Sequence, residues 1–207
     1  MKYDLDLEDH RVSKQTIIKI LITLVEAAIV IFAAYAITHY GLETMTVSGE
    51  YMSPTLKDGD SILINKMSYR MHRIHRNDVI VVQENGSEHS FFTLNRVIGL
   101  PGETVLIQDG QVYIDGKPLK EKLEFPLMEN GGMALDPVTL EEDEYFVLGD
   151  NRNECEDSRN ASVGNINKKD VVGKAWMRLN SFTFIGMIDN FEKKEVSSEE
   201  NGNETKK

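Results

Sequence analysis

Two side chains in the middle of this chain could act as nucleophiles. Ser53 carries a hydroxyl and Cys155 a thiol, and either could attack a carbonyl carbon if a base accepted its proton. His72, His75 and His89 are the imidazoles that could approach them in the folded chain, although none lies within several residues of Cys155. A Ser/His or Cys/His centre is one hypothesis. The alternative is that Ser53 is an ordinary variable position and that Cys155 has no base.

Two carboxylates on either side of Cys155 suggest a different chemistry. Asp150 and Asp157 could form an acid pair or contribute ligands to a metal ion. Asp157 could instead form a structural ion pair with Arg159. Cys155 is the single cysteine of the chain, which excludes an intramolecular disulfide and a multi-cysteine zinc site. The sequence has no glycine-rich nucleotide-binding loop, and we expect no cofactor.

The segments that must position these side chains are short and extended. After Tyr40, apolar and β-branched runs alternate with Gly, Asp and Asn turns, which is typical of strands. The dipeptides at 109–110 and 115–116 are both Asp-Gly, which favours tight hairpin turns. We therefore predict a mostly β, antiparallel sheet or barrel domain. The predicted strands are Ser61–Asn65, Asp78–Gln83, Phe91–Gly99, Thr104–Gln108, Gln111–Ile114, Glu144–Gly149 and Asp170–Leu179.

The predicted β domain spans residues 41–185. Within it, residues 108–145 form an insertion region, and the stretch Lys120–Glu144 reads as irregular because it is acidic and rich in Gly, Pro and Met. Residues 192–207 contain almost nothing apolar, so we predict a disordered tail.

A long apolar segment precedes the β domain. As a helix, residues 17–38 would cross the roughly 30 Å of membrane hydrocarbon. A cleaved signal peptide is the rival interpretation, because Ala34–Ala36 offers a cleavage pattern, but the N-terminal region is too acidic for one. No Lys or Arg occurs from Ile20 until Lys57. The positive-inside rule therefore predicts a single-pass protein of the cell membrane, with residues 1–16 cytoplasmic and the β domain outside.

Composition narrows the possible partners. The 207 residues include 34 acidic and 23 basic side chains, a net charge of −11, which disfavours nucleic acid as a partner. The mean hydropathy of −0.33 excludes a polytopic membrane protein. One strongly basic stretch, Lys66–Arg76, is either a contact with an anionic membrane surface or a solvated loop.

Four motifs occur in a fixed order behind the apolar segment. They are the first motif Ser48–Leu56 (SGEYMSPTL), a weaker one at Gly59–Lys66 (GDSILINK), the second motif Asn95–Glu103 (NRVIGLPGE) and the third motif Gly149–Arg159 (GDNRNECEDSR). Together they resemble the type I signal peptidases over residues 17–180. The resemblance implies a signal-peptidase-like β domain. In that family a serine in the first motif is the nucleophile, and a lysine before the second motif's arginine is the general base.

The chain departs from this pattern at three positions. The nucleophile position is Tyr51, the base position is Asn95, and a serine of the third motif that orients the lysine is Cys155. A carboxamide has no basic nitrogen, and a phenol with a pKa of about 10 is a poor nucleophile without a base. We expect the three positions to meet around one centre that no longer cuts peptides.

Other motif residues fit the family pattern. The resemblance implies that they shape or support a peptide-binding groove. They are Gly49, Met52, Pro54, Arg96, Gly149, Asp150, Asn151, Asp157, Ser158 and Arg159.

Three functions are compatible with these observations. The resemblance favours a non-catalytic protein that binds extended peptide segments and assists pilus assembly in Gram-positive bacteria, with a pilin or secreted precursor, and possibly a sortase, as partner. The lack of disulfides outside the membrane fits a Gram-positive cell surface. An active signal peptidase with a rewired centre and a purely structural membrane-anchored module are the alternatives.

Overall fold

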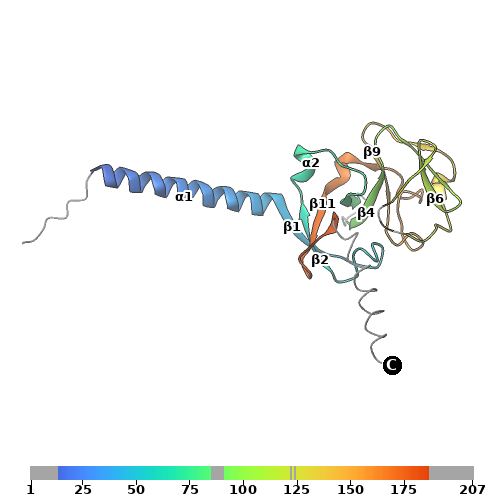
Figure 1. Cartoon of the computed structure of the whole chain (residues 1–207), viewed down its shortest axis with the longest axis horizontal. Helices are drawn as coiled ribbons and strands as arrows, with labels where there is room; N and C mark the ends of the chain where they lie inside the picture. Colours follow the sequence, from blue (N-terminus) through green and yellow to red (C-terminus); the bar gives the residue numbers. More distant parts are fainter. Residues whose placement is uncertain (1–13, 85–90, 122, 124, 187–207) are drawn as a thin grey trace, which may run out of the picture. The chain divides into compact units, whose positions relative to one another are not determined.

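The computed structural model describes residues 14–84, 91–121, 123 and 125–186. They fall into two compact units, an N-terminal helix and a β domain that begins at Leu42 (Figure 1). Helix α1 spans Lys14–Gly41, three residues longer at each end than the predicted span 17–38. It is long and apolar enough to cross a membrane, and its apolar side chains are exposed. The hydroxyls of Thr23 and Thr38 donate to backbone carbonyls one turn earlier, which satisfies them without water.

The β domain is built on an eight-stranded antiparallel sheet. The strands run in the order β1-β2-β11-β3-β4-β9-β10, and β12 pairs with β11. A short helix, α2 (Ser68–Met71), follows β2, and a 3-10 turn, η2 (Lys168–Asp170), precedes β11. The strands are β1 (Leu42–Thr46), β2 (Ser61–Asn65), β3 (Val79–Glu84), β4 (Phe91–Gly99), β9 (Glu144–Leu148), β10 (Ile166–Asn167), β11 (Val171–Arg178) and β12 (Thr183–Phe184).

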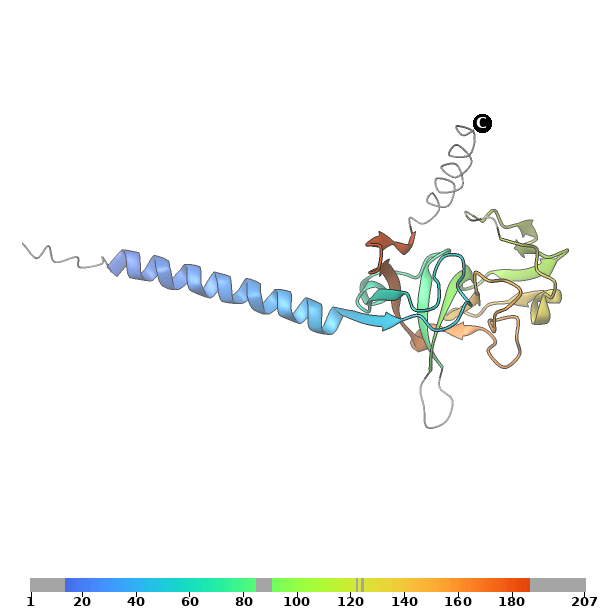
Figure 2. The same ribbon diagram turned by 90° about the horizontal axis from the view of Figure 1, so that it is seen from below.

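A second, four-stranded sheet lies beyond β4 and β9, at the other end of the domain from β1 and β2 (Figures 1 and 2). Its order is β7-β6-β5-β8. The 3-10 turn η1 (Gly132–Leu135) comes just before β8. The strands are β5 (Thr104–Gln108), β6 (Gln111–Ile114), β7 (Lys117–Pro118) and β8 (Val138–Thr139). The stretch Lys120–Glu144 is therefore not wholly irregular, because β8 returns to pair with β5.

Apolar side chains cover both faces of the main sheet. Along β3, Val79 and Val81 belong to one buried cluster, whereas Ile80 and Val82 belong to another. This alternation is what a strand buried on both faces requires. A third cluster, which includes Val105 and Phe146, joins the smaller sheet to β9. The predicted mostly β, antiparallel fold behind one apolar helix is confirmed.

Candidate functional site

The first motif forms a series of turns between β1 and β2 and is not a strand. The backbone N–H of Ser53 donates to Glu50 O (3.0 Å), and that of Leu56 donates to Met52 O (2.9 Å). Met52 and Leu56 are buried in the cluster under the sheet, and they anchor the turns. Because the chain turns at this point, Tyr51 and Ser53 do not lie on a strand.

A pocket of about 200 Å³ lies between these turns and β4. Two of the three diverging positions, Tyr51 and Asn95, line this pocket. Asn95 is 3% exposed, whereas Tyr51 is 54% exposed. The lining residues are Met45, Thr46, Val47, Ser48, Gly49, Tyr51, Met52, Phe92, Thr93, Leu94, Asn95 and Glu156.

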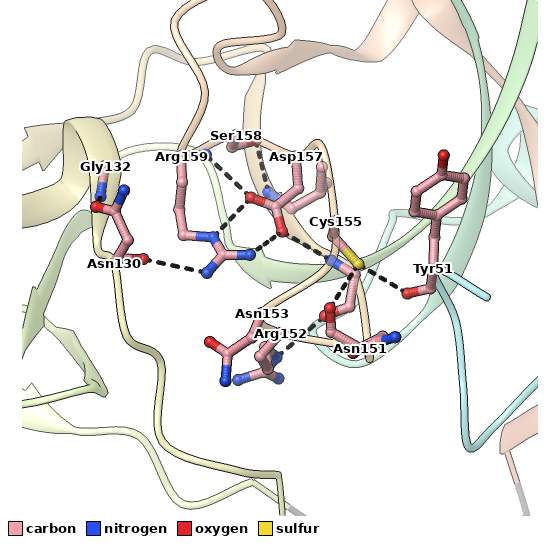
Figure 3. A network of polar contacts seen from close by, with 12 residues as sticks. Tyr51, Asn130, Gly132, Asn151, Arg152, Asn153, Cys155, Asp157, Ser158 and Arg159 are labelled. Atoms are coloured by element: carbon pink, nitrogen blue, oxygen red, sulfur yellow. Dashed lines mark hydrogen bonds and ion pairs between the residues drawn. The ribbon is translucent and has the colours of Figure 1, made fainter. Parts of the chain in front are cut away.

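Tyr51 is held by the glycine two residues before it. Gly49 has a φ of 84°, in the left-handed region that glycine adopts without strain, and its N–H donates to Asp58 Oδ1 (2.8 Å). A Cβ at position 49 would lie 2.8 Å from the Tyr51 ring, so the ring packs directly on this backbone. The ring points away from the loop that carries Cys155 (Figure 3).

Asn95 occupies the base position in a buried environment. It lies on β4 opposite Ile80 of β3, and its Nδ2 donates to Thr93 Oγ1 (3.4 Å). A carboxamide in this place can donate and accept hydrogen bonds but cannot take up a proton at neutral pH. The position therefore supplies polarity to the pocket without supplying a base.

No amine or imidazole replaces it among the described residues that line the pocket, since none is Lys or His. His75 lies near Asp78 instead, with Nδ1 4.0 Å from Oδ2. Lys174 is also engaged there, with Nζ 2.5 Å from Asp78 Oδ1. His72 contacts the carbonyl oxygen of Ser68, and neither histidine lines the pocket. His89 lies outside the described residues.

The third diverging position contacts the backbone of the first. Cys155 Sγ lies within hydrogen-bond distance of two carbonyl oxygens, Tyr51 O (2.9 Å) and Asn151 O (2.8 Å), as Figure 3 shows. Burial raises the pKa of the Cys155 thiol to about 12, and the carboxylate of Asp157 adds to this shift. A Cβ at Gly149 would lie 2.0 Å from the sulfur, so glycine is needed to make room for it. At neutral pH this thiol is protonated and is a poor nucleophile.

A buried ion pair ties the three motifs together. Arg96 donates to both carboxylate oxygens of Asp150, from Nε to Oδ1 (2.7 Å) and from Nη2 to Oδ2 (2.6 Å). The Thr55 hydroxyl donates to the same carboxylate, and Arg96 Nη1 donates to Asn77 O (3.0 Å). Bidentate geometry and added hydrogen bonds are what allow a charge pair to be buried. These residues do not line the pocket.

The third motif is fixed by a second ion pair. Arg159 donates from Nε and Nη2 to the two oxygens of Asp157 (both 2.8 Å), and the N–H of Gly149 donates to Asp157 Oδ2 (3.1 Å). Ser158 Oγ accepts from Val147 N (2.9 Å). This carboxylate is thus committed to structure, and the described residues hold no cluster of His, Cys, Asp and Glu suited to a metal ion.

The predicted groove residues therefore separate into lining and supporting groups. Gly49 and Met52 line the pocket, and the exposed Pro54 belongs to the turn. Asn151 supports the Tyr51 segment, because its N–H donates to Tyr51 O (3.1 Å). The other predicted groove residues belong to the two ion-pair networks described above.

Sequence reasoning missed most of the other lining residues, among them Glu156 and Phe92. Glu156 follows Cys155 inside the third motif, and Phe92 lies three residues before Asn95 on β4. Their nearness to diverging positions was the available signal. Which side chains of a turn face a pocket depends on packing, and the sequence pattern does not specify it.

Comparison with known proteins gives one family. The family described as "Signal peptidase, peptidase S26" matches this chain over residues 18–180. The chain is 34% identical over 155 residues to Signal peptidase I P of Bacillus subtilis subsp. natto, which covers 70% of this chain and 80% of that protein. It is 33% identical over 183 residues to Probable signal peptidase I-1 of Synechocystis sp., covering 81% and 90%. A crystal structure of a signal peptidase I from Enterococcus faecalis V583 matches with 31% identity and a TM-score of 0.39, over 50% of this chain and 97% of that one.

Proposed function

The chain belongs to the signal peptidase family, peptidase S26, and from this premise we propose that it binds extended peptide segments without cutting them. The observation that carries the proposal is the pocket. It contains a phenol and a carboxamide at the two positions where the family resemblance requires a hydroxyl nucleophile and an amine base. In an unrelated serine protease, losing either member of such a unit costs on the order of 10⁶ in turnover.

Strand addition offers a way to bind without catalysis. β1 lies at the edge of the main sheet, and its last residues Met45 and Thr46 line the pocket together with the following Val47 and Ser48. An edge strand presents unpaired N–H and C=O groups to an incoming extended segment. The neighbouring pocket can then receive one side chain of that segment, because successive side chains point to opposite faces of a strand.

A rewired hydrolytic centre is the competing function, favoured by the names of the relatives as signal peptidases. Ser48 supplies a hydroxyl at the pocket, but the described lining residues offer it no amine or imidazole. Cys155 has its pKa raised to about 12, which disfavours the thiolate that attack requires. Both observations support binding over cleavage.

We assign the bound segment to a pilin or a secreted precursor, with a sortase as a further partner, at the outer face of the membrane. The support is the family resemblance of the motifs combined with the altered dyad positions. In this role the protein assists pilus assembly as a membrane-anchored chaperone. Co-purification of a pilin with the full chain, lost on blocking the pocket by Ser48→Trp, would test the partner directly.

Restoring the dyad tests the loss of catalysis. The full chain and the variants Tyr51→Ser, Asn95→Lys and the double variant are incubated in detergent with a secretory precursor, and the products are identified by mass spectrometry. We expect no specific cut by the wild type or either single variant, and cleavage after a small residue by the double variant. Specific cleavage by the wild type that survives purification to homogeneity would refute the proposal. A double variant that does not cleave the precursor and also binds no peptide would favour a structural module instead.

A further inference from the structure

The pocket that is lined by Tyr51 and Asn95 contains a single charged side chain among its described lining residues. Glu156 is the only Asp, Glu, Lys or Arg among the described residues that line it. Its carboxylate is exposed and forms no hydrogen bond or ion pair with any described residue. The basic groups nearest in the motifs are committed elsewhere, since Arg96 pairs with Asp150 and Arg159 pairs with Asp157.

Two aromatic rings accompany this carboxylate. Tyr51 is 54% exposed and Phe92 is 49% exposed, and both line the pocket. The face of an aromatic ring attracts a cation, and the attraction is greatest where water is partly excluded. A carboxylate and two rings around one small space therefore form an environment that favours positive charge and disfavours negative charge.

The size of the pocket limits the ligand to one side chain. Its volume of about 200 Å³ is below the roughly 300–1,000 Å³ of sites that enclose a whole small molecule. A long side chain with an apolar stem and a cationic end matches the apolar residues Met45 and Met52 as well as Glu156.

We infer that this pocket selects a basic side chain, lysine or arginine, in the bound peptide segment, and that Glu156 is the residue that sets this specificity. The inference rests on the proposed peptide-binding function and names the class of segment. The net charge of −11 on the chain favours approach of such a segment.

The test compares peptides that differ at one position. The full chain in nanodiscs is titrated with acetylated Val/Ala heptapeptides that carry lysine, norleucine or glutamate at the centre, and Kd is measured by fluorescence polarisation. Norleucine matches the length of the lysine stem without its charge. We expect the lysine peptide to bind about fivefold to tenfold more tightly than the norleucine peptide, and the glutamate peptide to bind most weakly.

Variants identify the responsible group. Glu156→Gln should reduce the affinity for the lysine peptide to that for norleucine, and unchanged norleucine binding shows that the variant is folded. Glu142→Gln removes the same charge from an exposed position outside the pocket, and it should keep the lysine preference. Equal affinities for lysine and norleucine in the wild type, or a lysine preference that survives Glu156→Gln, would overturn this inference but not the proposed peptide-binding function. Failure of every peptide to bind overturns the proposed function as well.

Discussion

The Cys155 thiol combines a central position in the third motif with low reactivity. Its sulfur lies within hydrogen-bond distance of two carbonyl oxygens, and burial is the main cause that raises its pKa to about 12. At pH 8 the native thiolate fraction is therefore about a thousandfold below that of an ordinary thiol. A thiolate of higher pKa is a stronger nucleophile, which offsets part of this loss. We predict that iodoacetamide alkylates the native protein at least about tenfold more slowly than the urea-unfolded protein, as measured by mass spectrometry.

The pH dependence of the free energy of unfolding gives a second test of the raised pKa of this thiol. Because the folded pKa lies above the unfolded one, the contribution of Cys155 is fully present below pH 9 and is lost as pH rises toward 12. The free energy of unfolding should therefore fall more steeply over this window in the wild type than in Cys155→Ser, which controls for the tyrosines. Fast native alkylation at pH 8, or identical slopes for the two proteins, would show that the thiol ionises normally.

The site illustrates what sequence patterns can and cannot locate at the scale of residues. The motifs identified Tyr51 and Asn95 by type and position, and both line one pocket. They could not identify Glu156, because a turn has no repeating face. The place of Cys155 beside the carbonyl of Tyr51 likewise depends on the space that Gly149 leaves.

At the scale of elements, two hairpin turns allow a matched comparison. Asp109-Gly110 and Asp115-Gly116 have nearly the same backbone angles, with φ of 51° and 74° in the first and 50° and 74° in the second. Positive φ at both central residues is the type I′ geometry that suits a two-residue hairpin. The surroundings differ, because a Cβ at Gly110 would lie 2.9 Å from Met128 O, whereas a Cβ at Gly116 would meet nothing within 4 Å.

Alanine at the two glycines should therefore have unequal effects. Gly116→Ala should cost about 1 kcal/mol through backbone strain alone. Gly110→Ala should cost about 1–3 kcal/mol more, because the Met128 backbone must also move. Urea unfolding of the two variants measures the difference. Equal losses of stability would mean that the segment around Met128 adapts freely and does not constrain the hairpin.

Local patterns predicted the longer strands and missed those created by pairing. The bounds of β2, β4, β5 and β6 agree with the predicted strands, since apolar alternation and Asp-Gly turns mark them. β1 was missed because its sequence, LETMT, has little alternation, and pairing with β2 fixes its extended form. β7, β8, β10 and β12 are two residues long, too short for any periodicity.

At the scale of the whole molecule, the chain joins an apolar helix to a β domain that contains all three buried clusters. The apolar side chains of α1 are exposed, which is costly in water and favourable in lipid. A bound segment would therefore be held close to the membrane surface by the covalent link alone. This tethering raises its effective concentration there without any further contact.

The side of the membrane on which the β domain lies decides which partners it can meet. Basic residues precede Ile20 and are then absent until Lys57, so the positive-inside rule predicts an outer β domain. In a Cys155→Ala background, a cysteine replacing the exposed Lys168 should react with a membrane-impermeant maleimide in intact cells. A cysteine replacing Gln15, at the start of α1, should react only after permeabilisation. The reverse pattern would place the pocket in the cytoplasm, where it could not meet exported pilins.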